Sequence, residues 1–273
     1  MFRPCEMFLA ICLLLPVATW AGNVPSAEGL FEFRQIATLS KGLERALAER
    51  GVRVAIIGRI GLPATVMPPG VEFSHAGFAV YSTIRTADNR LVPGYAIYNL
   101  YQGDARTGVS FLAQDYPVDY FADIHALKAG VVIPAEKLQR RLAATIFSPT
   151  YKGLHNPHYS VLANPFRMDY QNCTGFVLDV LFASIYQTDD RRRIKANIAA
   201  YFQPHPIHVD GLKLALADAL MADVSTDDHV GPIATTTFES IARFLVNNGI
   251  ATEAFSFVVE PTTLYGSIEE LPL

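Results

Sequence analysis

Cysteine is scarce in this chain, with three among 273 residues: Cys5, Cys12 and Cys173. Cys5 and Cys12 lie in an N-terminal segment typical of an export signal, so the mature chain keeps Cys173 alone. An exported protein folds in an oxidising compartment, where a single thiol has no partner for an internal disulfide. The sequence therefore excludes a disulfide framework and calls for another explanation of Cys173.

The N-terminal segment has the layout of a secretory signal peptide. A basic residue precedes an apolar run over residues 7–18, and small residues occupy positions minus three and minus one of a cut between Ala21 and Gly22. We expect residues 1–21 to be removed and the mature protein to be periplasmic or secreted. A retained membrane anchor and a lipoprotein signal at Cys12 are the alternatives.

Long hydrophobic runs and basic clusters are missing from the rest of the chain. No later stretch is long enough to span a bilayer, so we expect no transmembrane span after processing. Lys and Arg number 22 against 26 Asp and Glu, and no basic stripe offers a surface for nucleic acid. No internal repeat or phosphate-binding glycine loop is present. We therefore predict a single domain over residues 22–273 with a sizeable core.

Hydrophobic periodicity indicates helices at both ends of a strand-rich centre. Three runs bounded by turn residues predict successive strands of a mostly antiparallel sheet, over 52–59, 73–82 and 94–101. Amphipathic patterns predict helices over 40–50, 134–146, 173–187, 189–202, 211–223 and 237–247, and a late strand is expected over 254–260. This pattern favours an α+β fold with a central antiparallel sheet packed against helices.

Cys173 lies at the expected start of the helix over residues 173–187. The positive end of a helix dipole lowers the pKa of a thiol, and the thiolate is the nucleophilic form. Backbone N–H groups of the first turn would face an oxyanion, with Gln171 and Asn172 as additional candidate donors. The other interpretation is a buried cysteine that serves as a small hydrophobic residue.

His75 is the candidate general base. Near the start of the strand expected over 73–82, His75 shares a face with Gly77 and Ala79, whose small side chains leave room for a helix end. A strand histidine is by itself more often structural, but its pairing with a cysteine at a helix start favours a base. The neighbouring strand offers Asn99 as the orienting residue, or Tyr98 if the opposite parity holds. Asparagine is disfavoured in strands, which suggests a role, although Asn99 could simply begin a turn.

Two histidine pairs have spacing that metal ligands also use. His155 and His158 form one pair, and His205 and His208 form the other. A proline interrupts each pair and neither has a third clustered ligand, so we expect loop histidines, with no metal and no cofactor.

The motifs around His75 and Cys173 together resemble a known group of enzymes. Ser-His-Ala-Gly-Phe-Ala-Val at 74–80, followed by Asn-Cys-Thr-Gly-Phe-Val at 172–177, resembles circularly permuted papain-like hydrolases and acyltransferases. These are related to NlpC-type cell-wall peptidases and to lecithin:retinol acyltransferase, and in them the histidine precedes the cysteine. A longer pattern that includes residues 58–61 resembles an uncharacterised bacterial family, domain of unknown function 2145, over most of residues 30–265.

This resemblance implies a papain-like domain with helical additions, in which Cys173 is the nucleophile, His75 the general base and Asn99 the orienting residue. Permuted relatives often carry a second histidine as the third catalytic residue. Asn99 differs from that histidine and resembles the side-chain amide that papain-type enzymes have there. The implied activity is hydrolysis or acyl transfer at an amide or ester, on a small molecule or peptide, with peptidoglycan stem peptides as the candidate substrate. The rival interpretation is a catalytically silent envelope binding or assembly module that keeps the fold and buries Cys173.

Overall fold

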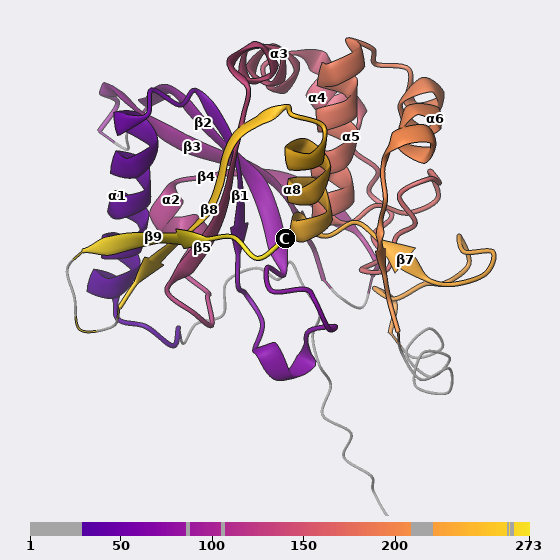
Figure 1. Ribbon diagram of the computed structural model, residues 1–273, viewed down its shortest axis with the longest axis horizontal. Coiled ribbons are helices and arrows are strands. Elements are labelled where there is room, and N and C mark those ends of the chain that lie inside the picture. Colours follow the sequence, from indigo (N-terminus) through magenta and orange to yellow (C-terminus); the bar gives the residue numbers. More distant parts are fainter. Residues whose placement is uncertain (1–28, 86–87, 105–106, 209–220, 261, 263–264) are drawn as a thin grey trace, which may run out of the picture.

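A seven-stranded antiparallel sheet organises the protein. The computed structural model describes residues 29–85, 88–104, 107–208, 221–260, 262 and 265–273. The strand order is β4-β3-β2-β1-β5-β8-β9, and every neighbouring pair is antiparallel. Figure 1 shows α1 and α2 on one side of the sheet and α3, α5 and α8 on the other. The expected α+β class with a central antiparallel sheet is confirmed.

The strands of this sheet are β1 (Val54–Arg59), β2 (His75–Arg85), β3 (Leu91–Gln102), β4 (Ser110–Asp115), β5 (Lys128–Pro134), β8 (Ala251–Val259) and β9 (Gly266–Glu270). A separate two-stranded sheet joins β6 (His205–Pro206) to β7 (Ala234–Thr235). The helices are α1 (Phe33–Glu49), η1 (Ala64–Val66, a 3₁₀ turn), α2 (Pro117–Tyr120), α3 (Glu136–Ile146), α4 (Pro149–Gly153), α5 (Cys173–Tyr186), α6 (Arg191–Tyr201) and α8 (Phe238–Asn247).

Most of the sequence predictions correspond to elements of this fold. The three successive strands are β1, β2 and β3, and the late strand is β8. The helix expected from residue 40 begins at Phe33, because Ile36 and Leu39 extend its buried stripe by two turns. The expected export signal and most of the helix expected over 211–223 lie outside the described residues.

The helix predicted over 134–146 was expected to begin at Pro134, and this start was wrong. Pro134 ends β5 and α3 begins only at Glu136, so this proline does not start a helix. The strand β5 was not expected from the sequence. It lies between β1 and β8, and its residues from Ala129 to Pro134 are buried. Burial on both faces produces a continuous apolar run, which periodicity alone does not separate from a buried helix segment.

Helix α5 is buried around most of its circumference. Twelve of its fourteen residues, from Cys173 to Ser184, are buried. The sheet, α3 and α6 pack against it. Burying each large apolar side chain contributes about 1.5–3 kcal/mol to folding, so α5 is held firmly in place. Its first residue is Cys173, which is therefore fixed relative to the sheet.

Candidate functional site

The start of α5 positions Cys173. The side chain of Asn172 caps the helix by accepting a hydrogen bond from the Gly175 N–H at 2.7 Å. Its amide nitrogen donates to the Val161 carbonyl and to the Thr235 hydroxyl, at 2.9 and 3.0 Å. Cys173 is thus the first helical residue, as the sequence predicts, and its side chain is only 2% exposed.

The Cys173 thiol reaches the sheet where β2 and β3 separate. Their pairing ends at Gly77 opposite Asn99, so the preceding residue Ala76 has no partner on β3. The Ala76 backbone N–H instead forms a hydrogen bond with the Cys173 sulfur. The sulfur therefore lies beside the peptide bond that joins His75 to Ala76.

A chain of hydrogen bonds fixes His75 on the other face of the sheet. The His75 Nε2 lies 3.0 Å from Asn99 Oδ1, and Asn99 Nδ2 donates to Asp115 Oδ2 at 2.9 Å. The same carboxylate oxygen accepts a hydrogen bond from the Tyr101 hydroxyl at 2.8 Å. The Tyr101 ring stacks parallel to the imidazole, with centroids 5.0 Å apart.

These hydrogen bonds also determine the tautomer of the imidazole. A carboxylate only accepts hydrogen bonds, so Asp115 must face the amide N–H of Asn99, whose oxygen then faces His75. His75 Nε2 must therefore carry the proton, and Nδ1 keeps its lone pair. Among the described residues Nδ1 has no hydrogen-bond partner, although the ring is fully buried.

Tyr98, the alternative orienting residue, lies on the opposite face of β3. Its ring packs edge-to-face against Phe147 and Tyr151. Successive strand residues point to opposite faces, so Tyr98 and Asn99 cannot both face His75. The contact with His75 is made by Asn99.

The electrostatics of the site differ from the expectation of a thiolate. Burial raises the pKa of Cys173, and this outweighs the opposing effects of the Ala76 and Thr174 N–H groups and of the Arg59 guanidinium. Burial, together with the charge of Arg59, lowers the pKa of His75 to about 3, while the hydrogen bond to Asn99 acts in the other direction. Near neutral pH the resting pair is a thiol and a neutral imidazole.

Arg59 is a buried cation at this site that sequence reasoning did not assign a role. It is directly opposite His75 on β1 and is 2% exposed. Its guanidinium donates to the Tyr120 carbonyl at 2.7 Å and lies over the Tyr101 and Tyr120 rings, at 5.6 and 5.2 Å. An arginine at the end of an apolar strand is the sequence signal that could have identified it.

The two candidate side-chain donors to an oxyanion are engaged elsewhere. The Gln171 amide oxygen accepts from Asn156 N–H, and its nitrogen donates to the Leu154 carbonyl and to Asp179. The Asn172 oxygen caps α5, and its amide nitrogen donates to the Val161 carbonyl and to the Thr235 hydroxyl. The remaining donors are the backbone N–H groups of Cys173 and Thr174, which form hydrogen bonds with the sulfur.

One histidine of each pair makes a local contact, and His205 begins strand β6. His155 Nε2 lies 3.0 Å from the Ser110 hydroxyl, and His205 Nε2 lies 3.0 Å from the Pro69 carbonyl. In the part of the chain that the structure describes, no three His, Cys, Asp or Glu side chains are grouped as metal ligands would be.

The profile of one protein family matches residues 46–245, which include Arg59, His75, Asn99, Asp115 and Cys173. Its description is "uncharacterized protein conserved in bacteria", domain of unknown function 2145. The chain belongs to this family. Neither the curated proteins nor the solved structures give a match. Within the described residues, no helix of this family member has the length and apolar character needed to cross a membrane.

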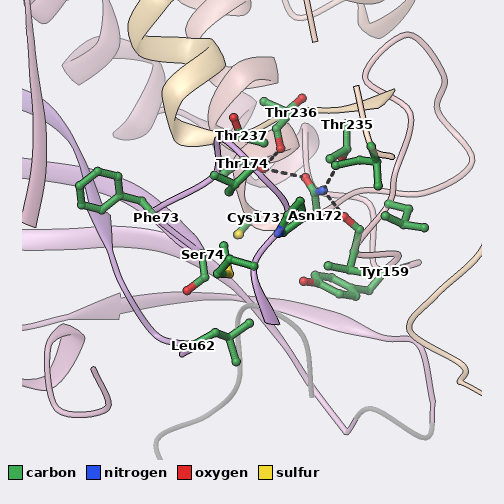
Figure 2. A pocket seen from close by; sticks show the side chains of 16 residues that line it. Leu62, Phe73, Ser74, Tyr159, Asn172, Cys173, Thr174, Thr235, Thr236 and Thr237 are labelled. Atoms are coloured by element: carbon green, nitrogen blue, oxygen red, sulfur yellow. Dashed lines mark hydrogen bonds between the residues drawn. The ribbon is translucent and has the colours of Figure 1, made fainter. Parts of the chain in front are cut away.

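A cavity of about 60 Å³ opens beside Cys173 in this member of the DUF2145 family. Figure 2 shows Thr174, Thr236 and Thr237 on one side of Cys173 and Ser74 on the other. The segment between β1 and β2, the loop after Tyr159 and the residues before α8 supply its walls. His75 does not line this cavity, so the thiol lies between the cavity and the histidine network.

Proposed function

We propose that this protein is an exported thiol hydrolase or acyltransferase with a permuted papain-like fold. Cys173 is the nucleophile, His75 the general base and Asn99 the residue that orients the imidazole. The substrate is an amide or an ester, and a peptidoglycan stem peptide is the candidate that export suggests. Export and the papain-like relationship rest on the N-terminal pattern and on the order of the two motifs, with the histidine first.

The observation that carries this proposal is the tautomer of His75. A buried histidine with a structural role normally uses both ring nitrogens, because an unpaired buried polar atom costs about 1–3 kcal/mol. Here Asn99 and Asp115 fix the proton on Nε2, and Nδ1 is left without a hydrogen bond beside the segment that contacts the Cys173 sulfur. The free Nδ1 lone pair is the atom with which a general base accepts a proton, and the lowered pKa of His75 makes the resting imidazole a weak base until its surroundings change.

The reaction follows from these positions. His75 Nδ1 takes the thiol proton while the Cys173 sulfur bonds to the carbonyl carbon, and the N–H groups of Cys173 and Thr174 stabilise the oxyanion. No hydrogen bond joins thiol and imidazole among the described residues, and His75 points away from the face of the sheet that α5 covers. The proposal therefore requires the two side chains to shift towards each other at the end of β2 when substrate binds. The carbon–nitrogen or carbon–oxygen bond then breaks, and the leaving group takes the proton from His75.

The thioester formed on Cys173 is released in a second step. His75 removes a proton from water or another acceptor, which attacks the thioester and restores the thiol. An imidazolium with a depressed pKa is a strong acid, so the buried His75 suits the protonation of a poor leaving group.

Intact-protein mass spectrometry with p-nitrophenyl acetate tests the proposal. We expect one acetyl group per chain on wild-type protein and none on Cys173→Ala. His75→Gln should slow acetylation at least about a hundredfold, which is the contribution of a general base. His125→Gln, a substitution of an exposed histidine, is the matched control and should keep the wild-type rate.

A catalytically silent binding module is the second candidate, favoured by the burial and raised pKa of the Cys173 thiol. In that case p-nitrophenyl acetate should leave Cys173 unmodified until the protein is denatured, and His75→Gln should change nothing. Such a result would reject the proposed enzyme.

A further inference from the structure

The cavity beside Cys173 has no charged lining among the described residues. Most of its wall is apolar, with side chains from segments far apart in the sequence that include Leu62, Met67, Val71, Phe73, Leu162 and Ile207. Arg59, the nearby cation, lies against Tyr101 and Tyr120 and does not line this space.

The polar side chains of the lining are mostly used by the protein itself. Ser74 Oγ accepts a hydrogen bond from the Gly61 N–H, and Thr174 Oγ1 donates to the Thr236 carbonyl. Thr235 Oγ1 donates to the Ala163 carbonyl. The Thr236 hydroxyl, which has no hydrogen-bond partner among the described residues, is a single neutral group. The cavity therefore offers no counter-charge to a ligand.

We propose that this cavity receives a short, uncharged aliphatic acyl group, held with its carbonyl carbon at the Cys173 sulfur. The inference rests on the proposed function and specifies its substrate. A charged group would lose its hydration without gaining a partner here, which is strongly unfavourable. A volume of about 60 Å³ holds about four or five water-sized groups, which corresponds to an acyl chain of similar length. A stem peptide with a charge next to the scissile carbonyl does not fit this site.

The acylation step balances without a further reactant. For a p-nitrophenyl ester, a bond forms between the Cys173 sulfur and the acyl carbon, and the bond from that carbon to the phenol oxygen breaks. The thiol proton passes to His75 Nδ1 and then to the released p-nitrophenolate. Water later cleaves the thioester, so one carboxylic acid and one p-nitrophenol are formed per ester.

An isosteric pair of esters tests the exclusion of charge. The 3,3-dimethylbutyryl and (trimethylammonio)acetyl groups have the same shape and differ by a quaternary carbon in place of a quaternary nitrogen. We expect the neutral p-nitrophenyl ester to acylate wild-type Cys173 about a hundredfold faster, after division by the spontaneous hydrolysis rates. A ratio below about tenfold overturns the inference.

A chain-length series tests the apolar wall and its size. Butyryl should acylate Cys173 about fifteenfold faster than acetyl, because each of its two additional buried methylenes contributes about fourfold. Octanoyl should be no faster than butyryl if the space ends after about five groups. A rate that is independent of chain length, or that rises steadily to octanoyl, overturns this assignment.

A charge placed at the cavity wall provides a readout that misfolding does not mimic. Leu62 is half-buried, so in Leu62→Glu the carboxylate can face the cavity while the stem packs on its wall. The rate with the charged ester relative to the neutral ester should rise at least about tenfold. Val246→Glu adds the same charge on the exposed face of α8 and should leave the ratio unchanged. An equal shift in both variants, or in neither, contradicts the proposed position of the acyl group.

The ester experiments can reject the aliphatic acyl site without rejecting the thiol enzyme. Acylation of Cys173 by all esters at similar rates keeps the thiol enzyme and removes the aliphatic acyl site. Absence of acylation by every ester, including acetyl, removes both. The wild-type ester series decides the question even if Leu62→Glu does not fold.

Discussion

The two sides of the Cys173 thiol differ in almost every physical property. On one side a buried polar network joins His75 to Asn99 and Asp115 by hydrogen bonds of 3.0 and 2.9 Å. On the other side lies an apolar cavity whose polar groups are mostly bonded to the protein. In the proposed reaction, the network specifies which proton moves and to which atom, whereas the cavity specifies which group can approach the sulfur.

This difference separates the chemistry of the site from its selectivity. His75 and Asn99 are fully buried and Asp115 is partly buried. The members of this network need one another, since a partly satisfied buried network is costly. The cavity wall comes from segments that tolerate exchange of one apolar residue for another of similar size. Substitutions in the network should therefore affect rate and stability together, and substitutions in the cavity should affect mainly the choice of substrate.

The largest expected effect is an acid-dependent loss of stability that originates in His75. Its pKa is about 3 in the folded protein and 6.5 is its ordinary value, so below pH 6.5 the unfolded chain binds a proton that the folded chain does not. Above pH 6.5 neither state binds this proton, so His75 causes no pH dependence of stability there. Below pH 6.5 the free energy of unfolding should decrease by about 1.4 kcal/mol per pH unit. His75→Gln should lack this slope.

Urea unfolding of wild-type protein and His75→Gln between about pH 6.5 and 4.5 measures this difference. The charged and titratable groups around His75 are Arg59, Asp115, Tyr101, Tyr120 and Cys173. Burial raises the pKa values of Tyr101, Tyr120 and Cys173 further above this window. Parallel pH dependence of the two proteins would show that His75 binds its proton in the folded state and that the network is not closed to water.

A smaller effect is expected when the amide of the network is removed. Asn99→Ala leaves the Nε2–H of His75 buried without an acceptor, which costs about 1–3 kcal/mol of stability, and the tautomer is no longer fixed. The acylation rate per folded protein should decrease about ten- to a hundredfold.

Asn156→Ala is the matched control for Asn99→Ala. Asn156 is also buried, and its amide donates to the Met168 and Asp169 carbonyls, away from the imidazole. This variant should lose similar stability and keep its acylation rate. If both variants lose rate in proportion to stability, Asn99 has only a structural role.

The sequence predicts the features of the site that depend on neighbouring residues or on adjacent strands. Contacts with distant segments depend on the tertiary structure and could not be predicted. The start of α5 was predictable because Asn172 is a strong capping residue, and the relation of His75 to Asn99 follows from two adjacent antiparallel strands. Asp115 was missed because β4 is a short edge strand with a weak pattern.

The burial of the site residues was the main property that local sequence patterns did not predict. A helix start predicts a lowered thiol pKa, yet the enclosure of Cys173 by distant segments reverses the direction. Gln171, two residues before the cysteine, suggested an oxyanion donor, but Asp179 and the Leu154 carbonyl occupy its amide nitrogen. Neither contact can be inferred from spacing along the chain.

The smallest expected effect tests the strand register on which the comparison depends. Tyr98 adjoins Asn99 in sequence but packs against Phe147 and Tyr151 on the other face of the sheet. Tyr98→Phe keeps the ring and removes only the hydroxyl, so the acylation rate should stay within about twofold of wild type and stability within about 0.5 kcal/mol. Stopped-flow measurement of p-nitrophenol release, with Asn99→Ala in parallel, gives both rates. A loss in Tyr98→Phe as large as that in Asn99→Ala would mean that β3 presents the opposite face to His75, and the assignment of the proton to Nε2 would have to be abandoned.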